Sequence, residues 1–143
     1  MDIQNSYRKI IEIMKNILEE IAARTRERIA KEKSRISVSE LENRIQEVNK
    51  NARQKITFLQ ALQKDGMSYI CEVKKASPSK GLIAPDFPYL AIAKEYEQAG
   101  ASAISCLTEP FYFQGADQYL REISAAVQIP VLRKDFTVDE YMI

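Results

Sequence analysis

Apolar residues recur at intervals of three and four along the first part of the chain, and charged residues fill the positions between them. The apolar positions are Ile3, Tyr7, Ile10, Met14, Ile17 and Ile21, with Ile11 and Leu18 beside them. Because an α-helix has about 3.6 residues per turn, this spacing predicts one long amphipathic helix from Ile3 to about Lys33. The charged positions are expected to form its solvated face.

Two further helices are predicted by their start signals. A Ser or Thr followed three residues later by Glu or Gln can form a capping box, in which each partner satisfies a backbone N–H group of the other. Such pairs are Ser37 with Glu40, Ser39 with Glu42, and Thr57 with Gln60. The first two are alternative starts for a helix through about Asn49, and the third predicts a short helix ending near Gly66.

From Met67 onward the pattern changes to alternating strands and helices. Strands are predicted at residues 68–75, 102–108 and 129–136, and helices at 89–99 and 117–127, with 137–143 beginning a further helix. Asp86 is the expected N-cap near Pro88, and Gly100 is expected to end the helix that follows. Strands that alternate with helices of this length predict a parallel sheet with right-handed crossovers.

The first predicted strand is charged where a parallel strand buried on both faces would be apolar. Because strand side chains alternate, Ile70, Glu72 and Lys74 share one face. Cys71 and Val73 share the other face. Charges on a half-buried face are costly unless they are paired, so Glu72 and Lys74 are candidate site residues. A simple ion pair at a strand end is the alternative.

Lys134 meets the same test on the third predicted strand, where it shares a face with Leu132 and Phe136. Arg133 and Asp135 then lie on the outward face, so they are expected near the strand end, where water or a helix terminus can reach them. All these charges lie at the carboxyl ends of their strands. Open α/β sheets and β/α barrels bind ligands at that end.

The composition limits the functions open to the chain. Its 143 residues suffice for one ordinary domain, and a net charge of +1 gives no general attraction to nucleic acid. No apolar run approaches the ~20 residues that span a bilayer, so neither a nucleic acid nor a membrane is expected as a partner. The residues after Met1 do not have the pattern of a secretory signal, and a cytoplasmic location is expected.

Cysteine and histidine usage restricts the chemistry. Cys71 and Cys106 lie in different predicted strands and form no CxxC pair, so reduced packing cysteines and no metal site are expected. The chain contains no histidine, which excludes a Ser-His or Cys-His nucleophile. Proton transfer would then depend on Lys, Glu, Asp or Tyr.

Three segments carry a resemblance to a known family. In order and spacing, "CEVKKASPSKG" (71–81), "ASAISCLTEPFYFQG" (101–115) and "PVLRKDF" (130–136) resemble indole-3-glycerol phosphate synthases, as does the helical N-terminal region. The resemblance implies an eightfold β/α barrel with added N-terminal helices. It also implies a carbon-carbon lyase of tryptophan biosynthesis that needs no cofactor. The family converts 1-(o-carboxyphenylamino)-1-deoxyribulose 5-phosphate to indole-3-glycerol phosphate, carbon dioxide and water.

The family's motifs give roles to residues of this chain. Glu72, Lys74 and Ser77 fall in its E-x-K-x-x-S-P-S motif, and Lys134 falls in its K-D-F motif. As the resemblance implies, Lys134 is the general acid that donates to the substrate's ketone oxygen, and Lys74 holds the benzoate carboxylate. Glu72 orients the lysines and assists dehydration, while Ser77 contacts the substrate.

Apolar residues near the same strand ends are expected to line a slot for the substrate's anthranilate ring. They are Leu107, Phe113 or Phe111, and Phe136. Aromatic faces favour edge or offset contact with such a ring. Plain core packing is the alternative, because bulky apolar residues at strand ends usually belong to the core.

The chain departs from the family in its extent. A β/α barrel needs eight strands and ~250 residues. We therefore expect an α/β fragment, an incomplete (β/α)8 barrel, with a helical extension at 1–66 and the first three β/α units at 67–143. It would lack the family's second catalytic carboxylate, its substrate-binding asparagine and its phosphate-binding loops. The fragment is expected to be inactive alone.

Two alternative functions stay open. The apolar positions of the first helix approach a heptad seam, so the chain could be an interaction module that forms a homo-oligomer through this helix or through the open sheet. Another phosphate-sugar barrel, such as phosphoribosylanthranilate isomerase, is the second alternative. The E-x-K-x-x-S-P-S motif speaks against it.

Overall fold

The helices and strands expected from the periodicity form two compact units. The computed structural model describes residues 3–50 and 56–143, with side chains from residue 17 onward in the first range. One unit contains the chain up to residue 52 together with residues 136–143, and the other contains residues 53–135. In the part described, no helix is both long and apolar enough to cross a membrane.

The first unit is built on two helices. Helix α1 runs over Ile3–Arg35 and confirms the predicted long helix. Helix α2 runs over Val38–Lys50, and the hydroxyl of Ser37 accepts the N–H of Glu40 at 3.2 Å, so Ser37 is the residue that begins it. The side chains of the first apolar positions of α1, up to Met14, lie outside the described residues. The heptad seam therefore stays a prediction.

The C-terminal segment of this unit is fixed to the end of α1. The ammonium group of Lys33 lies 2.7 Å from the Asp139 carboxylate, and the hydroxyl of Tyr141 donates to the carbonyl of Ile36 at 3.0 Å. The helix expected at 137–143 is a single 3₁₀ turn, η1, over Glu140–Met142, which the Asp139 side chain caps by accepting the N–H of Tyr141.

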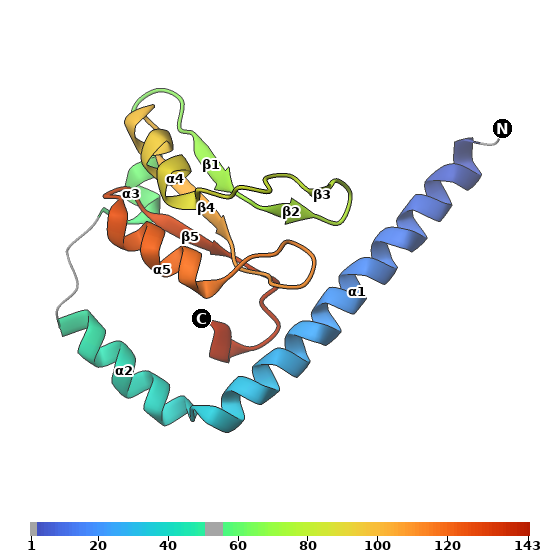
Figure 1. Cartoon of the computed structure of the whole chain (residues 1–143), viewed down its shortest axis with the longest axis horizontal. Coiled ribbons are helices and arrows are strands. Elements are labelled where there is room, and N and C mark those ends of the chain that lie inside the picture. Colours follow the sequence, from blue (N-terminus) through green and yellow to red (C-terminus); the bar gives the residue numbers. More distant parts are fainter. Residues whose placement is uncertain (1–2, 51–55) are drawn as a thin grey trace. The chain divides into compact units, whose positions relative to one another are not determined.

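The second unit contains the parallel sheet (Figure 1). Its strands are β1 (Ile70–Val73), β4 (Ala103–Leu107) and β5 (Val131–Lys134), in the order β1-β4-β5, and both pairings are parallel. Helix α4 (Tyr89–Gln98) connects the first two strands, and helix α5 (Asp117–Ala126) connects the second and third. The predicted β-α-β-α-β order and parallel sheet are confirmed.

One face of the sheet carries the hydrophobic core. The side chains of Val73, Ile104 and Cys106 point to this face and pack against Ala93 of α4 and Ile123 of α5, all buried. All five residues of β4 are buried, as expected of a central strand with a neighbour on each side. Burying a side chain of Val or Ile size contributes about 1.5–3 kcal/mol, so this packing stabilises the unit.

The ends of α4 correct one prediction and confirm another. Asp86 is not its N-cap: Pro88 occupies that position without any side-chain cap bond. Proline can start a helix because its fixed φ suits the first turn and its missing N–H would have no partner there. Gly100 ends the helix as predicted, with φ of 91°, and its N–H donates to the carbonyl of Glu97.

Two further elements complete this unit. Helix α3 (Phe58–Leu62) begins with the predicted capping box of Thr57 and Gln60 but ends at Leu62 rather than near Gly66. A short antiparallel hairpin follows β1, formed by β2 (Ala76–Ser77) and β3 (Gly81–Leu82). Sequence periodicity did not predict this hairpin, because two-residue strands are too short to show an alternation.

We expect the polypeptide of residues 1–143 to self-associate. In the described part of the chain β1 and β5 are edge strands, and Ile70 and Leu132 are 49% and 46% exposed on the face opposite α4 and α5. Unpaired edges and exposed apolar side chains favour pairing with another copy. Sedimentation of the polypeptide tests this, and Leu132→Asn should weaken the association. The matched control Leu59→Asn, an exposed leucine of α3, should not. A stable, dilute monomer with cooperative unfolding would contradict the prediction.

Candidate functional site

A carboxylate shared between two lysines lies at the carboxyl ends of the strands. Glu72 Oε2 accepts a hydrogen bond from Lys134 Nζ at 2.7 Å, and Glu72 Oε1 accepts one from Lys74 Nζ. Glu72 comes from β1 and Lys134 from β5, and β4 lies between these strands. The sheet thus brings together three residues that are up to 62 positions apart in the sequence. We call these three residues the charged trio.

The charged trio is on the face of the sheet opposite α4 and α5. Glu72 aligns with Ser105 of β4, and Lys134 aligns with Leu107, so these residues share a face. The side chain of Glu72 is 27% exposed and that of Lys134 is 52% exposed. The groups are therefore half-buried and reachable, and two ammonium groups beside one carboxylate leave an excess positive charge. Such a site suits an anionic ligand.

The lysines change the ionisation of Glu72. Partial burial favours the neutral carboxyl group, but the hydrogen bonds and charges of Lys134 and Lys74 together outweigh it, and they hold the pKa of Glu72 below its usual range. The carboxylate therefore stays ionised near neutral pH and keeps accepting from both lysines.

The remaining predicted site residues occupy different surroundings. Leu107 is the buried last residue of β4, next to the trio by register. Phe113 is half-buried in the loop after β4. Ser77 lies in the β2–β3 hairpin, where its hydroxyl accepts the N–H of Lys80 at 3.3 Å. Phe136 is half-buried and is the first residue of the other unit's C-terminal segment. The structure thus brings the trio and Leu107 together, and the roles of all the predicted site residues stay predictions.

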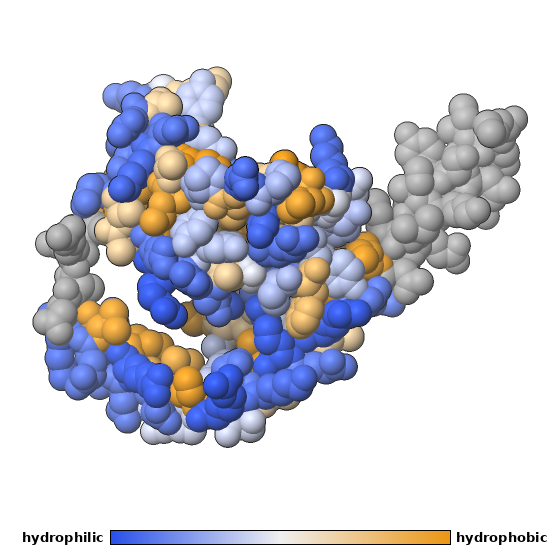
Figure 2. All heavy atoms as spheres, viewed as in Figure 1, coloured by the Kyte–Doolittle hydropathy of each residue, from blue (hydrophilic) through white to orange (hydrophobic). Residues whose placement is uncertain are grey.

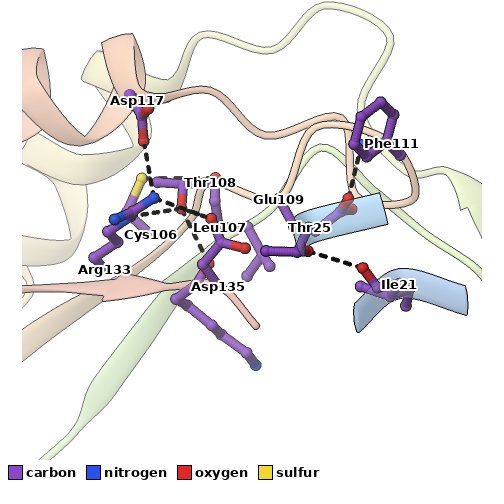
Figure 3. Close-up of polar contacts among 11 residues, drawn as sticks. Ile21, Thr25, Cys106, Leu107, Thr108, Glu109, Phe111, Asp117, Arg133 and Asp135 are labelled. Carbon is purple, nitrogen blue, oxygen red and sulfur yellow. Dashed lines mark hydrogen bonds and ion pairs between the residues drawn. The ribbon is translucent and has the colours of Figure 1, made fainter. Parts of the chain in front are cut away.

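Sequence reasoning missed Glu109, which organises the loop that carries Phe113. Its fully buried carboxylate accepts the backbone N–H groups of Phe111, Tyr112 and Phe113 at 2.9, 2.7 and 3.0 Å. Figure 3 shows the first of these contacts. A buried carboxylate needs such donors to offset its lost hydration. The available signal was a glutamate two residues after the end of the apolar strand β4.

Gly115 closes the same loop against the end of β4. Its N–H donates to the carbonyl of Glu109 at 2.8 Å. A Cβ atom at this position would lie 2.5 Å from the carbonyl oxygen of Leu107, closer than non-bonded atoms can approach, so only glycine fits. The loop over residues 109–115 is therefore held at both ends against β4.

A second polar cluster lies on the helix-covered face. Arg133 contacts Asp135, Thr108 and, at 3.5 Å, Asp117, the first residue of α5 (Figure 3). This confirms that Arg133 and Asp135 lie outward near a helix terminus. Cys106 is buried on the same face, and burial, with a smaller effect of Asp117, raises the pKa of its thiol to about 11. The thiol therefore stays protonated and inert near neutral pH.

Parallel strands with crossover helices, and polar groups gathered at their carboxyl ends, occur in β/α-barrel enzymes and in open α/β sheets. The family model described as indole-3-glycerol phosphate synthase matches residues 18–143. The chain belongs to the indole-3-glycerol phosphate synthase family. Both the resemblance and the predicted fold class, an α/β fold with an incomplete (β/α)8 barrel, are confirmed.

Curated relatives with the name indole-3-glycerol phosphate synthase support this membership. The protein from Lacticaseibacillus paracasei is 53% identical over 127 residues, and the one from Ruminiclostridium cellulolyticum is 51% identical over 128 residues; each match covers 89% of this chain and 48% of the relative. A third, from Thermoanaerobacter pseudethanolicus, is 44% identical over 89% of this chain and 47% of the relative. The chain spans about half the length of the curated relatives it matches.

We predict that the charged trio stabilises the fold only above acidic pH. The folded pKa of Glu72 lies below the unfolded value, so its stabilisation is complete above the usual glutamate range and is lost as pH falls through the lowered folded pKa. The difference in free energy of unfolding between the parent and Glu72→Gln should therefore shrink over that window.

Denaturant titrations at several pH values and one protein concentration measure this difference. Glu95→Gln, on the exposed face of α4, is the matched control and should show little difference at any pH. A parent-to-Glu72→Gln difference that stayed constant into strong acid would contradict the prediction.

Proposed function

We propose that, in the context of a full-length enzyme, the charged trio supplies catalytic residues for the indole-3-glycerol phosphate synthase reaction on 1-(o-carboxyphenylamino)-1-deoxyribulose 5-phosphate. The observation that carries the proposal is the Glu72 carboxylate shared by Lys74 and Lys134 at the carboxyl ends of the strands. The substrate is a phosphorylated anion with a benzoate carboxylate, which matches the excess positive charge. The reaction is a lyase reaction of tryptophan biosynthesis.

The first step is ring closure. A carbon of the aromatic ring attacks the substrate's ketone carbon, a carbon-carbon bond forms, and Lys134 donates a proton to the ketone oxygen as it gains charge. A positioned acid of this kind contributes typically ~10²–10⁴-fold to the rate. Lys74 holds the benzoate carboxylate and takes part in later proton transfers.

The later steps remove two small molecules. The benzoate carboxylate leaves as carbon dioxide, and its bonding electrons return to the ring. The new hydroxyl group then takes up a proton and leaves as water, and the adjacent carbon of the new ring loses a proton so that the double bond of the indole forms. Glu72 assists this dehydration. Because Glu72 bridges both lysines, it also keeps their ammonium groups directed at one place. No cofactor is proposed, since lysine and glutamate side chains supply every proton transfer.

We propose that the apolar slot for the anthranilate ring includes Leu107, Phe113 and Phe136, with Ser77 as a further substrate contact. The loop held by Glu109 supports this role for Phe113, because it fixes the backbone from which the ring projects.

The proposed organisation is a helical extension at 1–66 followed by three β/α units at 67–143. Two free cysteines, Cys71 and Cys106, support a reducing, cytoplasmic location.

Replacing Lys134 tests the proposed acid. We suggest a chimera in which residues 1–143 continue into the second half of a full-length relative, because the family's remaining site residues lie there. In this chimera Lys134→Ala should lower turnover by a factor on the order of 10² or more while the substrate still binds. Indole fluorescence follows the product. Lys94→Ala, an exposed lysine of α4, is the control. Near-normal turnover of Lys134→Ala would contradict the assignment.

Replacing Lys74 tests the carboxylate contact separately. In the same chimera Lys74→Ala should raise KM as well as slow turnover, because it removes a charge-assisted contact worth typically ~1.5–3 kcal/mol. Steady-state kinetics over a range of substrate concentrations separates the two parameters. A variant with lowered kcat and unchanged KM would exclude Lys74 from holding the carboxylate.

A further inference from the structure

Lys134 occupies a position where a side chain is hard to hold. It is the last residue of β5, its side chain is 52% exposed, and a lysine side chain has many rotamers. Its ammonium group nevertheless lies 2.7 Å from Glu72, which belongs to a strand that is not its neighbour in the sheet. Other contacts must therefore hold the backbone of Lys134 in place and determine the face of the sheet to which its side chain points.

The backbone at Lys134 is held by Thr108. Leu107 and Lys134 are the last aligned residues of β4 and β5, and the N–H of Thr108 donates to the carbonyl of Lys134 at 3.0 Å. The pairing of the two strands therefore continues one residue beyond β4. This bond prevents fraying of β5 at the residue that carries the ammonium group.

The residues on either side of Lys134 are held on the opposite face. The Thr108 hydroxyl donates to Asp135 Oδ2 at 3.0 Å and accepts from Arg133 Nε at 3.3 Å, and Arg133 Nη2 lies 3.2 Å from the same Asp135 oxygen. Figure 3 shows the side chains of Thr108, Asp135 and Arg133, together with Asp117, which contacts Arg133. The Asp135 side chain is only 2% exposed. Removing the donors of a buried carboxylate strongly destabilises the folded protein.

We propose that Thr108 and Asp135 are positioning residues for Lys134. Because strand side chains alternate, holding residues 133 and 135 on the helix-covered face directs the side chain of Lys134 to the other face, toward Glu72. A catalytic effect of positioning Lys134 rests on the proposed function, but the positioning of Lys134 by Thr108 and Asp135 does not. Thr108 and Asp135 lie on the far side of the sheet from the trio and act only through Lys134.

The pKa of Glu72 in the 143-residue chain reports this positioning without turnover. Glutamate labelled with ¹³C at the carboxyl carbon allows an NMR titration, and Glu72→Gln identifies the resonance. Lys134→Met removes the ammonium group and gives the full rise in the pKa of Glu72 that follows its loss. Lys74, Lys134 and Glu72 are the charged groups facing one another here, and Lys74 remains in every variant.

We expect Thr108→Val and Asp135→Asn each to raise the pKa of Glu72 by at least about half of the rise in Lys134→Met, because the ammonium group then spends much of its time elsewhere. Two controls are matched. Thr108→Ser keeps the hydroxyl and should behave like the parent. Asp117→Asn removes the same charge as Asp135→Asn from the exposed end of the network, where the side chain is 64% exposed, and should also leave the titration unchanged.

Several outcomes would overturn the proposal. One is a parent-like titration in both Thr108→Val and Asp135→Asn, and another is an unchanged pKa in Lys134→Met. An equal rise in Asp117→Asn and Asp135→Asn would show that the buried contacts of Asp135 are not what positions Lys134. A general charge effect would instead lower the pKa of Glu72, because each substitution removes a negative charge. Loss of the folded spectrum in both test variants would mean that the network serves stability alone.

Lack of turnover in the chimera would reject the proposed function and leave this titration result standing.

Discussion

The sharing of the Glu72 carboxylate between Lys74 and Lys134 is the interaction on which the arrangement of the site depends. Two ammonium groups placed this close together would repel each other without the carboxylate between them. The carboxylate in turn would be costly on a half-buried strand face without donors. Each charge therefore offsets the cost of the others. The result is a fixed positive site on a face of the sheet that is otherwise built from small and apolar side chains.

The alternation of side chains gives the two faces of the parallel sheet different characters. On one face Val73, Ile104 and Cys106 are buried under two helices and supply the core. On the other face Glu72 and Lys134 remain reachable. Adjacent residues of one strand thus serve different purposes. The contacts of Thr108 and Asp135 on the helix-covered face position Lys134 on the other face, because they hold the backbone from which Lys134 projects.

The loop after β4 has its own polar anchor. Glu109 is buried and uses both carboxylate oxygens to accept backbone N–H groups of the loop. Gly115 allows the loop to return onto the carbonyl of Leu107 at a distance that no side chain would permit. The backbone that carries Phe113 therefore has a defined shape.

The sequence by itself determined the order of the long elements and the members of the charged trio. Periodicity predicted α1, the parallel strands and both crossover helices, because these segments are long enough for their repeats to show. The tertiary structure alone decided what happens at strand ends and in loops. The β2–β3 hairpin, the Pro88 start of α4 and the anchoring role of Glu109 depend on contacts with residues distant in sequence or on exact backbone angles. So does the pairing of Lys134 with Glu72, since the two residues meet only when β4 aligns their strands.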